Sequence, residues 1–286
     1  MDLKKVLNDF NELVMFKHTL FSLPFIFISM VVASNGWFGF DLLILGLLCA
    51  ISARNFAMAL NRFADSDIDI KNPRTQERPS VDGRVGREKI LFFTILNGAL
   101  FIFIAYLINN LAFYLSFPTL FILGIYSYFK RFSYLAHVVL GVSLGLAPIA
   151  GVVAVSETIT MWAVFLALGV LFWVAGFDLL YSLQDMEFDK QEGLFSIPSK
   201  FGLECTMFIS KLFHVLTVLF WLFFVIEANL SIFAYLAVIF SALMLSYEHY
   251  LVNKDFKKID RAFFTVNGYL GILFLILIIT DRAIYG

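Results

Sequence analysis

Residues 41–69, DLLILGLLCAISARNFAMALNRFADSDID, join a long apolar run to an abrupt acidic end. Residues 161–189, MWAVFLALGVLFWVAGFDLLYSLQDMEFD, repeat this arrangement. An apolar run of about 20 residues is long enough to cross the hydrocarbon core of a bilayer as a helix. The two stretches therefore predict membrane-spanning helices that each end in a group of carboxylates at the membrane surface.

The rest of the chain has the same apolar character. Hydrophobic residues make up 60% of the 286 residues and charged residues only 15%, which is more apolar surface than a soluble core buries. The apolar runs are continuous rather than alternating in polarity, so helices are predicted and not membrane-spanning strands. We expect an all-α membrane bundle, a single domain over 1–286, around a central cavity that opens to the cytoplasm or the lipid. The nine candidate spans are 18–35, 38–61, 90–108, 111–128, 134–155, 161–181, 206–226, 231–251 and 263–280.

The distribution of basic residues predicts the orientation. Of the 21 Lys and Arg residues, 19 lie on the side of the acidic ends, and the connections on the other side contain none. The positive-inside rule then places the N-terminus and the polar segments 62–89 and 182–205 in the cytoplasm, and an odd number of spans places the C-terminus outside. Residues 1–17 have apolar residues at helical spacing, which predicts an amphipathic helix at the membrane interface.

The two acidic ends share a spacing. A shift of 120 residues places Asp65 on Asp185 and Asp69 on Asp189, and Asn61 precedes the first pair by one helical turn. On a helix, residues four apart share a face, where like charges repel. A divalent cation would remove this repulsion. Mg²⁺ favours a few carboxylates completed by phosphate oxygens and water, whereas the lack of His in either group disfavours zinc.

Basic residues near the acidic ends would bind the anion that accompanies such a cation. Guanidinium and ammonium groups bind phosphate oxygens through charge-assisted hydrogen bonds. A solvated acidic loop would explain one acidic end alone, but two matched ends beside several cations predict a metal-bridged diphosphate site. The cations are Arg74, Arg78, Lys130 and Arg131.

Two ionisable residues lie deeper in the predicted bilayer. Arg54 precedes Asn61 by two turns, about 10 Å, and Asp178 precedes Asp185 by the same interval. Ionisable groups at this depth usually line a polar cavity. Arg54 either pairs with Asp178 for structure alone or anchors a carboxylate on an organic acceptor. Three histidines without ligand spacing are interpreted as structural: His137, His214 and His249.

Two long motifs contain these residues. The first, Asn-x-x-x-Asp-x-x-x-Asp followed by Arg-Thr-x-x-Arg-Pro, is matched by 61–69 and 74–79. The second, Asp-x-x-Tyr-x-x-x-Asp-x-x-x-Asp-x-x-x-Gly-x-x-Ser, is matched by 178–196. With these motifs and nine spans, the chain resembles the UbiA superfamily of intramembrane prenyltransferases over essentially its whole length.

The resemblance implies a division of roles among the residues. Carboxylates of both motifs would hold two Mg²⁺ ions on the diphosphate of a polyprenyl donor, and Arg54 would lie in the acceptor pocket. Arg62 and Phe195 depart from the pattern, since many members have Asp and Lys there. The implied metal ligands are Asn61, Asp65, Asp69, Asp185 and Asp189. The expected substrate-binding residues are Arg54, Asn61, Arg74, Arg78, Tyr126, Lys130, Arg131 and Tyr181.

The expected reaction follows from the resemblance. Departure of the diphosphate leaves an allylic cation, and the electron-rich ring of an aromatic acid forms a carbon–carbon bond to it. The ring then loses a proton, for which Asp178 is a candidate base. Residues 184–198 most resemble bacterial 4-hydroxybenzoate polyprenyltransferase-like members, which indicates ubiquinone or menaquinone biosynthesis in a bacterial inner membrane. 1,4-Dihydroxy-6-naphthoate is the alternative acceptor. His18 and Thr19 match a stretch of aromatic-acid prenyltransferases.

A secondary transporter is the alternative from another class. Its sites would lie at the middle of the bilayer on broken helices, whereas these acids gather at one interface. Membrane lipid is the expected surrounding, and no nucleic-acid partner is expected.

Overall fold

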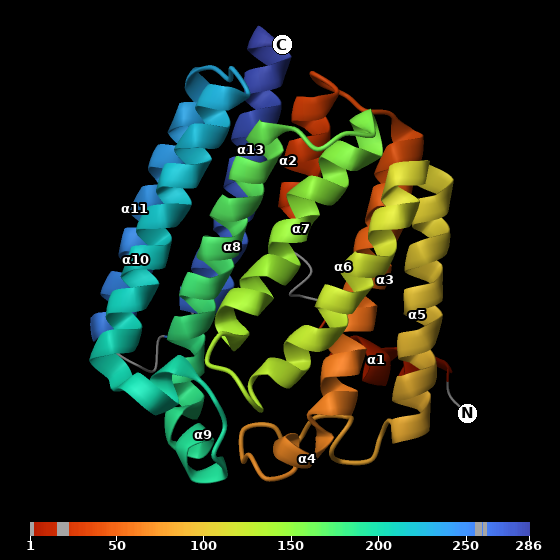
Figure 1. Cartoon of the computed structure of the whole chain (residues 1–286), viewed down its shortest axis with the longest axis vertical. Coiled ribbons are helices and arrows are strands. Elements are labelled where there is room, and N and C mark those ends of the chain that lie inside the picture. The colour runs from red at the N-terminus through yellow and green to blue at the C-terminus, as the bar shows by residue number, and fades with distance from the viewer. Residues whose placement is uncertain (1–2, 16–22, 255–258, 260–261) are drawn as a thin grey trace.

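The protein is described by a computed structural model that covers residues 3–15, 23–254, 259 and 262–286. Every regular element in these ranges is helical (Figure 1), which confirms the predicted all-α class. The helices are α1 Leu3–Leu13, α2 Leu23–Ala33, α3 Phe40–Ala64, α4 Ser66–Asp69, α5 Arg87–Ile108, α6 Asn110–Phe129, α7 Ala136–Ser156, α8 Met161–Ser182, α9 Met186–Glu192, α10 Ile197–Glu227, α11 Ile232–Lys254 and α13 Asn267–Tyr285. A 3₁₀ turn, Leu183–Asp185, precedes α9, and a π-helix, Ala262–Val266, precedes α13.

Eight of the helices in the described ranges are long and apolar enough to cross a membrane. The first of the nine predicted spans, 18–35, corresponds to the shorter apolar helix α2 of 11 residues. At 1.5 Å per residue α2 is about 16 Å long, roughly half the hydrocarbon thickness. His18 and Thr19 lie outside the described residues.

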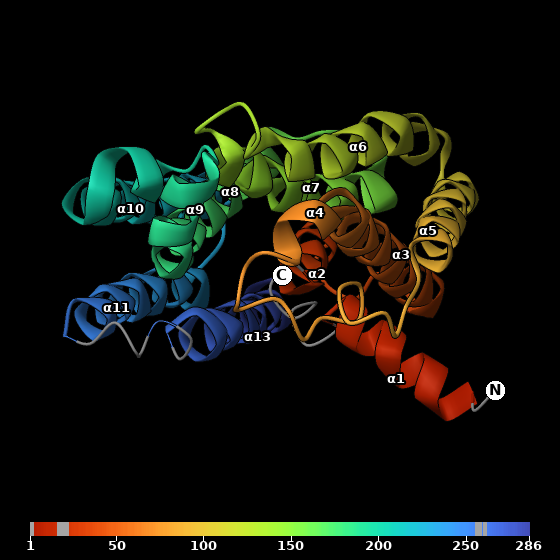
Figure 2. The same ribbon diagram turned by 90° about the horizontal axis from the view of Figure 1, so that it is seen from below.

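The bundle has two sides joined by an aromatic core. Seen from below, α6, α7, α8 and α10 lie along one side and α11 and α13 along the other, with α2 between α7 and α13 (Figure 2). Phe25 of α2 stacks on Trp221 of α10 and also meets Trp173 of α8, with ring centroids 5.4 and 5.1 Å away. Gly169 permits this packing, because a Cβ there would lie 2.2 Å from Trp221. Buried aromatic contacts of this kind stabilise a fold beyond their area alone.

Both acidic ends lie at one end of the molecule, opposite the C-terminus (Figure 1). Asp65, at the end of α3, has φ −95° and ψ 4°, and Asp185 has the nearly identical values −100° and 2°. A short helix follows each residue, α4 or α9. The helix expected to run without interruption from Asn61 through Asp69 therefore ends at Ala64, and the chain changes direction at the aspartate.

Much of the segment 182–205, expected to be a loop, is helical. It contains α9, and α10 begins at Ile197 instead of near residue 206. Ser196 and Ser199 form a reciprocal capping box at the start of α10, which satisfies backbone donors that a helix leaves free. A kink at Gly202, with φ 77°, separates this first turn from the membrane-spanning part.

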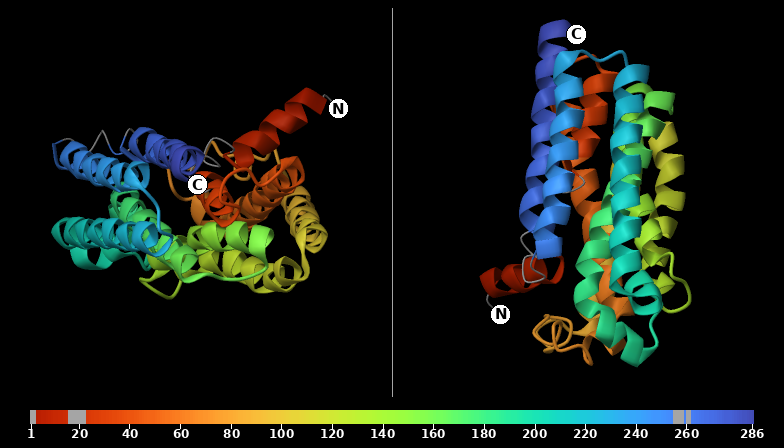
Figure 3. Two further views of the ribbon diagram at one scale, coloured as in Figure 1. Left: turned by 90° about the horizontal axis from the view of Figure 1, so that it is seen from above. Right: turned by 90° about the vertical axis from the view of Figure 1, so that its left-hand side faces the viewer.

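The N-terminal helix α1 runs across the bundle axis at the end that carries the acidic segments (Figure 3). Its last residues insert into the bundle, where Leu13 packs with Ala59 and Val85. Outside, Arg84 holds Glu12 through two hydrogen bonds of 2.6 and 2.8 Å. The location of α1 at a membrane interface stays a prediction.

Candidate active site

A polar pocket lies between the ends of α3, α6, α7 and α8. Both acidic segments contribute to its wall, together with most of the predicted cations and Asp178. The predicted residues that line it are Asn61, Asp65, Asp69, Arg74, Arg78, Tyr126, Lys130, Asp178, Tyr181, Asp185 and Asp189. The sequence spacing therefore identified side chains that the fold brings to one cavity from positions more than 100 residues apart.

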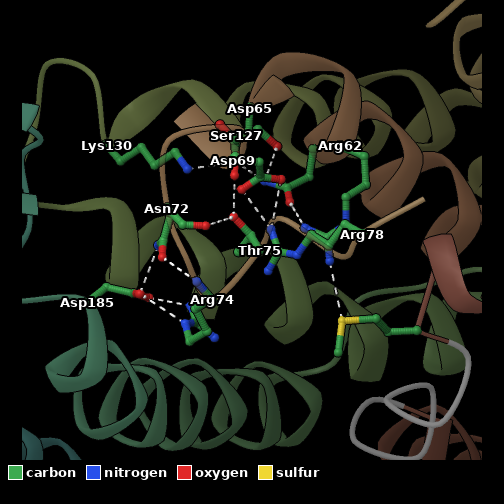
Figure 4. A network of polar contacts seen from close by, with 12 residues as sticks. Arg62, Asp65, Asp69, Asn72, Arg74, Thr75, Arg78, Ser127, Lys130 and Asp185 are labelled. Carbon is green, nitrogen blue, oxygen red and sulfur yellow. Dashed lines mark hydrogen bonds and ion pairs between the residues drawn. The ribbon is translucent and has the colours of Figure 1, made fainter. Parts of the chain in front are cut away.

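The first acidic segment is buried and paired with cations (Figure 4). Asp65 and Asp69 are only 3% and 4% exposed. Lys130 Nζ lies 2.8 Å from Asp65 Oδ2, and the amide of Asn61 donates to the same oxygen at 2.8 Å. Arg78 Nη1 donates to both oxygens of Asp69, at 2.7 and 2.8 Å. Each buried charge thus has an opposite charge beside it, as burial requires.

The loop after α4 is braced by its own polar side chains. The buried hydroxyl of Thr75 donates to the carbonyl of Asp69 at 2.6 Å. Asn72 accepts a hydrogen bond from the backbone N–H of Arg74 at 3.0 Å, which is an Asx-type turn. These contacts aim Asn72 and Arg74 across the pocket toward α8.

The second acidic segment receives its partners from the first (Figure 4). Asp185 accepts hydrogen bonds from the Asn72 amide at 3.1 Å and from Arg74 Nε at 3.0 Å, and Arg74 Nη2 forms an ion pair with its other oxygen. Arg74 Nη1 also donates to the Tyr181 hydroxyl at 2.9 Å. Asp189 lines the same pocket beside Ser196. Arg74 therefore links the two segments.

The pocket has the donor chemistry for Mg²⁺. Among the described residues no three His, Cys, Asp or Glu side chains lie close enough together to hold a metal ion, because cations stand between the carboxylates. One buried oxygen, Asp65 Oδ1, has no hydrogen-bond partner. Burial raises the pKa of Asp65 while Lys130 opposes that shift. Oxygen donors, an unpartnered buried carboxylate oxygen and neighbouring basic side chains fit a hard cation that is shared with an anionic ligand.

The deeper charges have partners other than each other. Asp178 Oδ2 lies 2.7 Å from Nδ1 of the buried His137, and Arg54 Nη2 donates to the backbone carbonyl of Met15 at 3.3 Å. The structural pairing of Arg54 with Asp178 is therefore wrong. Sequence analysis also missed His137 as a pocket residue, although an ionisable side chain inside an apolar run is itself a signal.

Other residues form contacts that their spacing in the sequence did not predict. Arg131 holds Asp67 and the Ala64 carbonyl, with contacts of 2.7 and 2.6 Å, so it braces the end of α3. Arg62, which departs from the family pattern, donates to the Asn61 side chain at 3.1 Å and orients that amide. His214 and His249 hydrogen-bond to each other at 2.9 Å, between α10 and α11.

The chain is similar to known proteins over most of its length. Residues 22–278 match the model of the UbiA prenyltransferase family. The 4-hydroxybenzoate octaprenyltransferase of Haemophilus ducreyi is 31% identical over 90% of this chain and 92% of that protein. The apo structure of a UbiA homolog from Aeropyrum pernix K1 is also 31% identical, with a TM-score of 0.84 over 92% of this chain and 98% of that one.

A more distant neighbour has the same fold. The UbiA homolog from Archaeoglobus fulgidus, solved with DMAPP and Mg²⁺ bound, has a TM-score of 0.77 at 20% identity, over 96% of this chain and 99% of that one. The family match covers most of the chain and includes both acidic segments. The chain belongs to the UbiA prenyltransferase family.

Proposed function

We propose that this protein transfers a polyprenyl group from a polyprenyl diphosphate to the ring of an aromatic acid, in a reaction that requires Mg²⁺. The observation that carries the proposal is the single pocket in which both acidic segments meet Arg74, Arg78 and Lys130. The named activity of the H. ducreyi relative supports an aromatic acceptor, with 4-hydroxybenzoate the first candidate. The DMAPP and Mg²⁺ of the A. fulgidus homolog support the donor and the metal.

The donor diphosphate would lie between the two acidic segments. Asp65, Asp69, Asp185 and Asp189 would hold Mg²⁺, with Asn61 beside them, and bound Mg²⁺ would neutralise charge on the departing diphosphate. Arg74 and Lys130 now pair with carboxylates. When substrate and metal are bound, the two basic groups would pair with diphosphate oxygens and the carboxylates would pair with Mg²⁺. Each charged group would thus exchange its present partner for another of opposite charge.

The acceptor would lie deeper, between the diphosphate and Arg54. Arg54 would bind the carboxylate of the aromatic acid, in place of the Met15 carbonyl that its guanidinium now contacts. Asp178 would accept the proton that the ring loses after the carbon–carbon bond forms, and His137 would orient Asp178 through their 2.7 Å contact. Tyr126 and Tyr181, which line the same pocket, would exclude water around the allylic cation.

The setting follows from the charge distribution. The acidic segments, with 62–89 and 182–205, would face the cytoplasm of a bacterial cell, and the C-terminus would face outward. In the structure these segments and the C-terminus lie at opposite ends of the bundle, which supports that orientation (Figure 1). A transporter is disfavoured, because the charged pocket lies at one end of the helices rather than midway along them.

Release of pyrophosphate tests the proposal. Purified protein with a polyprenyl diphosphate and Mg²⁺ should release pyrophosphate and form prenylated product with 4-hydroxybenzoate or with 1,4-dihydroxy-6-naphthoate, assayed side by side. Arg54→Ala should raise the acceptor KM by about 10- to 100-fold, the size of a lost charged hydrogen bond, with little change in donor KM. Arg282→Ala at the far end of the bundle is the control. An unchanged acceptor KM in Arg54→Ala would reject the anchoring role, and no turnover with either acceptor would reject the proposed function.

A further inference from the structure

Two arginines of α3, Arg54 and Arg62, differ from the other cations of the site in their partners. Arg62 is only 4% exposed, and Arg54 Nε is buried without a hydrogen-bond partner. Within the described part of the chain neither guanidinium forms an ion pair, whereas Arg74, Arg78 and Lys130 each pair with an aspartate. A cation inside a protein is costly unless an opposite charge lies beside it. The two arginines therefore have the chemistry of an anion-binding site.

The present partners of both guanidiniums are neutral. Arg62 donates from Nε to the Leu13 carbonyl at 3.4 Å, from Nη1 to the Asn61 side chain at 3.1 Å, and from Nη2 to Met15 Sδ at 3.3 Å (Figure 4). Arg54 Nη2 donates to the Met15 carbonyl at 3.3 Å. The contacts to the two carbonyls are longer than the roughly 2.8 Å of a charged N–H···O pair. A carboxylate would bind either guanidinium more tightly than these groups do.

The two guanidiniums meet at one residue, Met15, which follows the C-terminal end of α1. One guanidinium contacts its carbonyl and the other its sulfur. The last carbonyls of a helix have no intrahelical partner and carry a partial negative charge, so they attract cations. Met15 also has φ 48°, a conformation that residues other than glycine rarely adopt. The end of α1 thus covers both cations with partial charges and a strained residue.

A cavity opens at the same place. This outer vestibule is lined by Met15, Arg54 and Arg62, and also by Tyr126 and Asp178. Arg62 borders the polar pocket of the acidic segments as well. One ligand in the vestibule can therefore contact both guanidiniums and still reach the candidate base and the diphosphate site.

We propose that Arg54 and Arg62 together bind the carboxylate of the aromatic acid, and that the pair makes the protein select an acid over a neutral phenol. The inference rests on the proposed function and adds Arg62 to it as a residue that contacts the acceptor. Each guanidinium offers N–H donors that match the two oxygens of a carboxylate. The acid supplies the charge that both arginines lack, and Met15 gives up its contacts with them when the acid binds.

Removing the charge of Arg62 tests this assignment. In Arg62→Gln the ratio of kcat/KM for 4-hydroxybenzoate to that for 4-hydroxybenzamide should fall at least about tenfold, the size of a lost charged contact, with donor KM unchanged. Arg62→Lys should recover part of the ratio. Arg87→Gln is the matched control, since Arg87 is exposed and lies over the Phe63 ring of α3 outside the vestibule.

The alternative is that Arg62 acts only through Asn61. Arg62→Gln would then lower turnover of the acid and of the amide equally and raise the donor KM, because Asn61 stands beside the metal-binding aspartates. That result, or an unchanged ratio, would overturn the inference. Absence of turnover by the wild-type protein with either proposed aromatic acid would instead reject the proposed function.

A second measurement uses the wild-type protein. Hydrogen peroxide oxidises the sulfur of methionine, and a sulfur that accepts a hydrogen bond from a guanidinium is less nucleophilic. With Mg²⁺ and a non-hydrolysable donor analogue present, saturating 4-hydroxybenzoate should raise the rate of Met15 sulfoxide formation at least about twofold, and 4-hydroxybenzamide should not. Met161, exposed at the other end of α8, is the internal reference for mass spectrometry. An unchanged or lower Met15 rate in protein that turns over the acid would overturn the inference.

Discussion

The two acidic segments have the same backbone turn but different support. Asp65 and Asp185 share nearly identical φ and ψ angles, and a short helix follows each. The first segment is held by its own contacts, from Thr75 to the Asp69 carbonyl and from Arg78 to the Asp69 carboxylate. Asp185 has no such contact within the second segment, since among the described residues its side-chain partners, Asn72 and Arg74, belong to the first segment.

This difference predicts different effects for substitutions in the two segments. A change in the first segment should affect both the chemistry and the stability of the fold, because its carboxylates are buried beside buried or half-buried cations. A change in the second should affect the chemistry while the fold persists, since the Asp185 side chain is 18% exposed and no α9 residue is buried. The matched spacing in the sequence conceals this asymmetry.

Asparagine substitutions should show the asymmetry with the largest effect. Asp69→Asn and Asp189→Asn should each lower pyrophosphate release by about 10³-fold, as loss of a group that stabilises transition-state charge does. Only Asp69→Asn should also lower the midpoint of thermal unfolding, by several degrees, because it leaves the Arg78 guanidinium without its charged partner. Detergent-solubilised protein allows both measurements. Equal shifts in the unfolding midpoint would show that the two segments have the same support.

Arg74 is the link between the segments and should give the next largest effect. Arg74→Gln should raise the donor KM by about 10- to 100-fold, because a charge-assisted contact is lost to both Asp185 and the diphosphate. Lys71→Gln is a matched control, since Lys71 also spans the segments but forms an exposed ion pair with Glu192. Exposed pairs contribute little, so its donor KM should not change. A similar rise in both variants would mean that total charge, and not the Arg74 contact, controls donor binding.

Sequence reasoning found the helices and the acidic ends for a simple physical reason. Apolar runs must cross the bilayer as helices, and the spacing of carboxylates by one helical turn is visible in the amino-acid sequence itself. The partners of those carboxylates depend on contacts between distant parts of the chain. Asn72 meets Asp185, and His137 meets Asp178, across 113 and 41 residues, so neither contact follows from local pattern.

The boundaries missed by the sequence have a different origin. Hydropathy detects only the part of a helix that lies inside the membrane. Helix α10 begins at Ile197, nine residues before the predicted apolar run, and this additional part contains the polar residues Ser199, Lys200 and Glu204. Outside the bilayer, polar residues are free to be helical. The break at Asp65 was equally invisible, because Asp65 and its neighbours carry no Gly or Pro that would mark the end of a helix.

Thr75 tests the internal support of the first segment. Thr75→Val keeps the side-chain shape but removes the hydroxyl, which leaves the buried Asp69 carbonyl without this donor and should cost about 2 kcal/mol. The unfolding midpoint should fall by several degrees, and the donor KM should rise because Asn72 and Arg74 follow the same loop. Thr158→Val, on the exposed loop after α7, should leave both quantities unchanged. Unaltered stability in Thr75→Val would mean that the ion pairs of the segment, such as Arg78 with Asp69 and Lys130 with Asp65, hold it without the Thr75 hydroxyl.

Gly193 tests the second segment and should give the smallest effect. It caps α9 with φ 68°, a left-handed conformation that costs an alanine about 1 kcal/mol, although a Cβ there would meet nothing within 4 Å. Gly193→Ala should therefore lower the unfolding midpoint slightly, and Gly193→Asn should restore it because asparagine tolerates this conformation. Pyrophosphate release should stay close to wild type in both, since Arg74 and Asn72 hold Asp185 from the other segment. A large loss of activity in Gly193→Ala would mean that the geometry of α9 itself positions Asp185 and that the second segment is not merely held by the first.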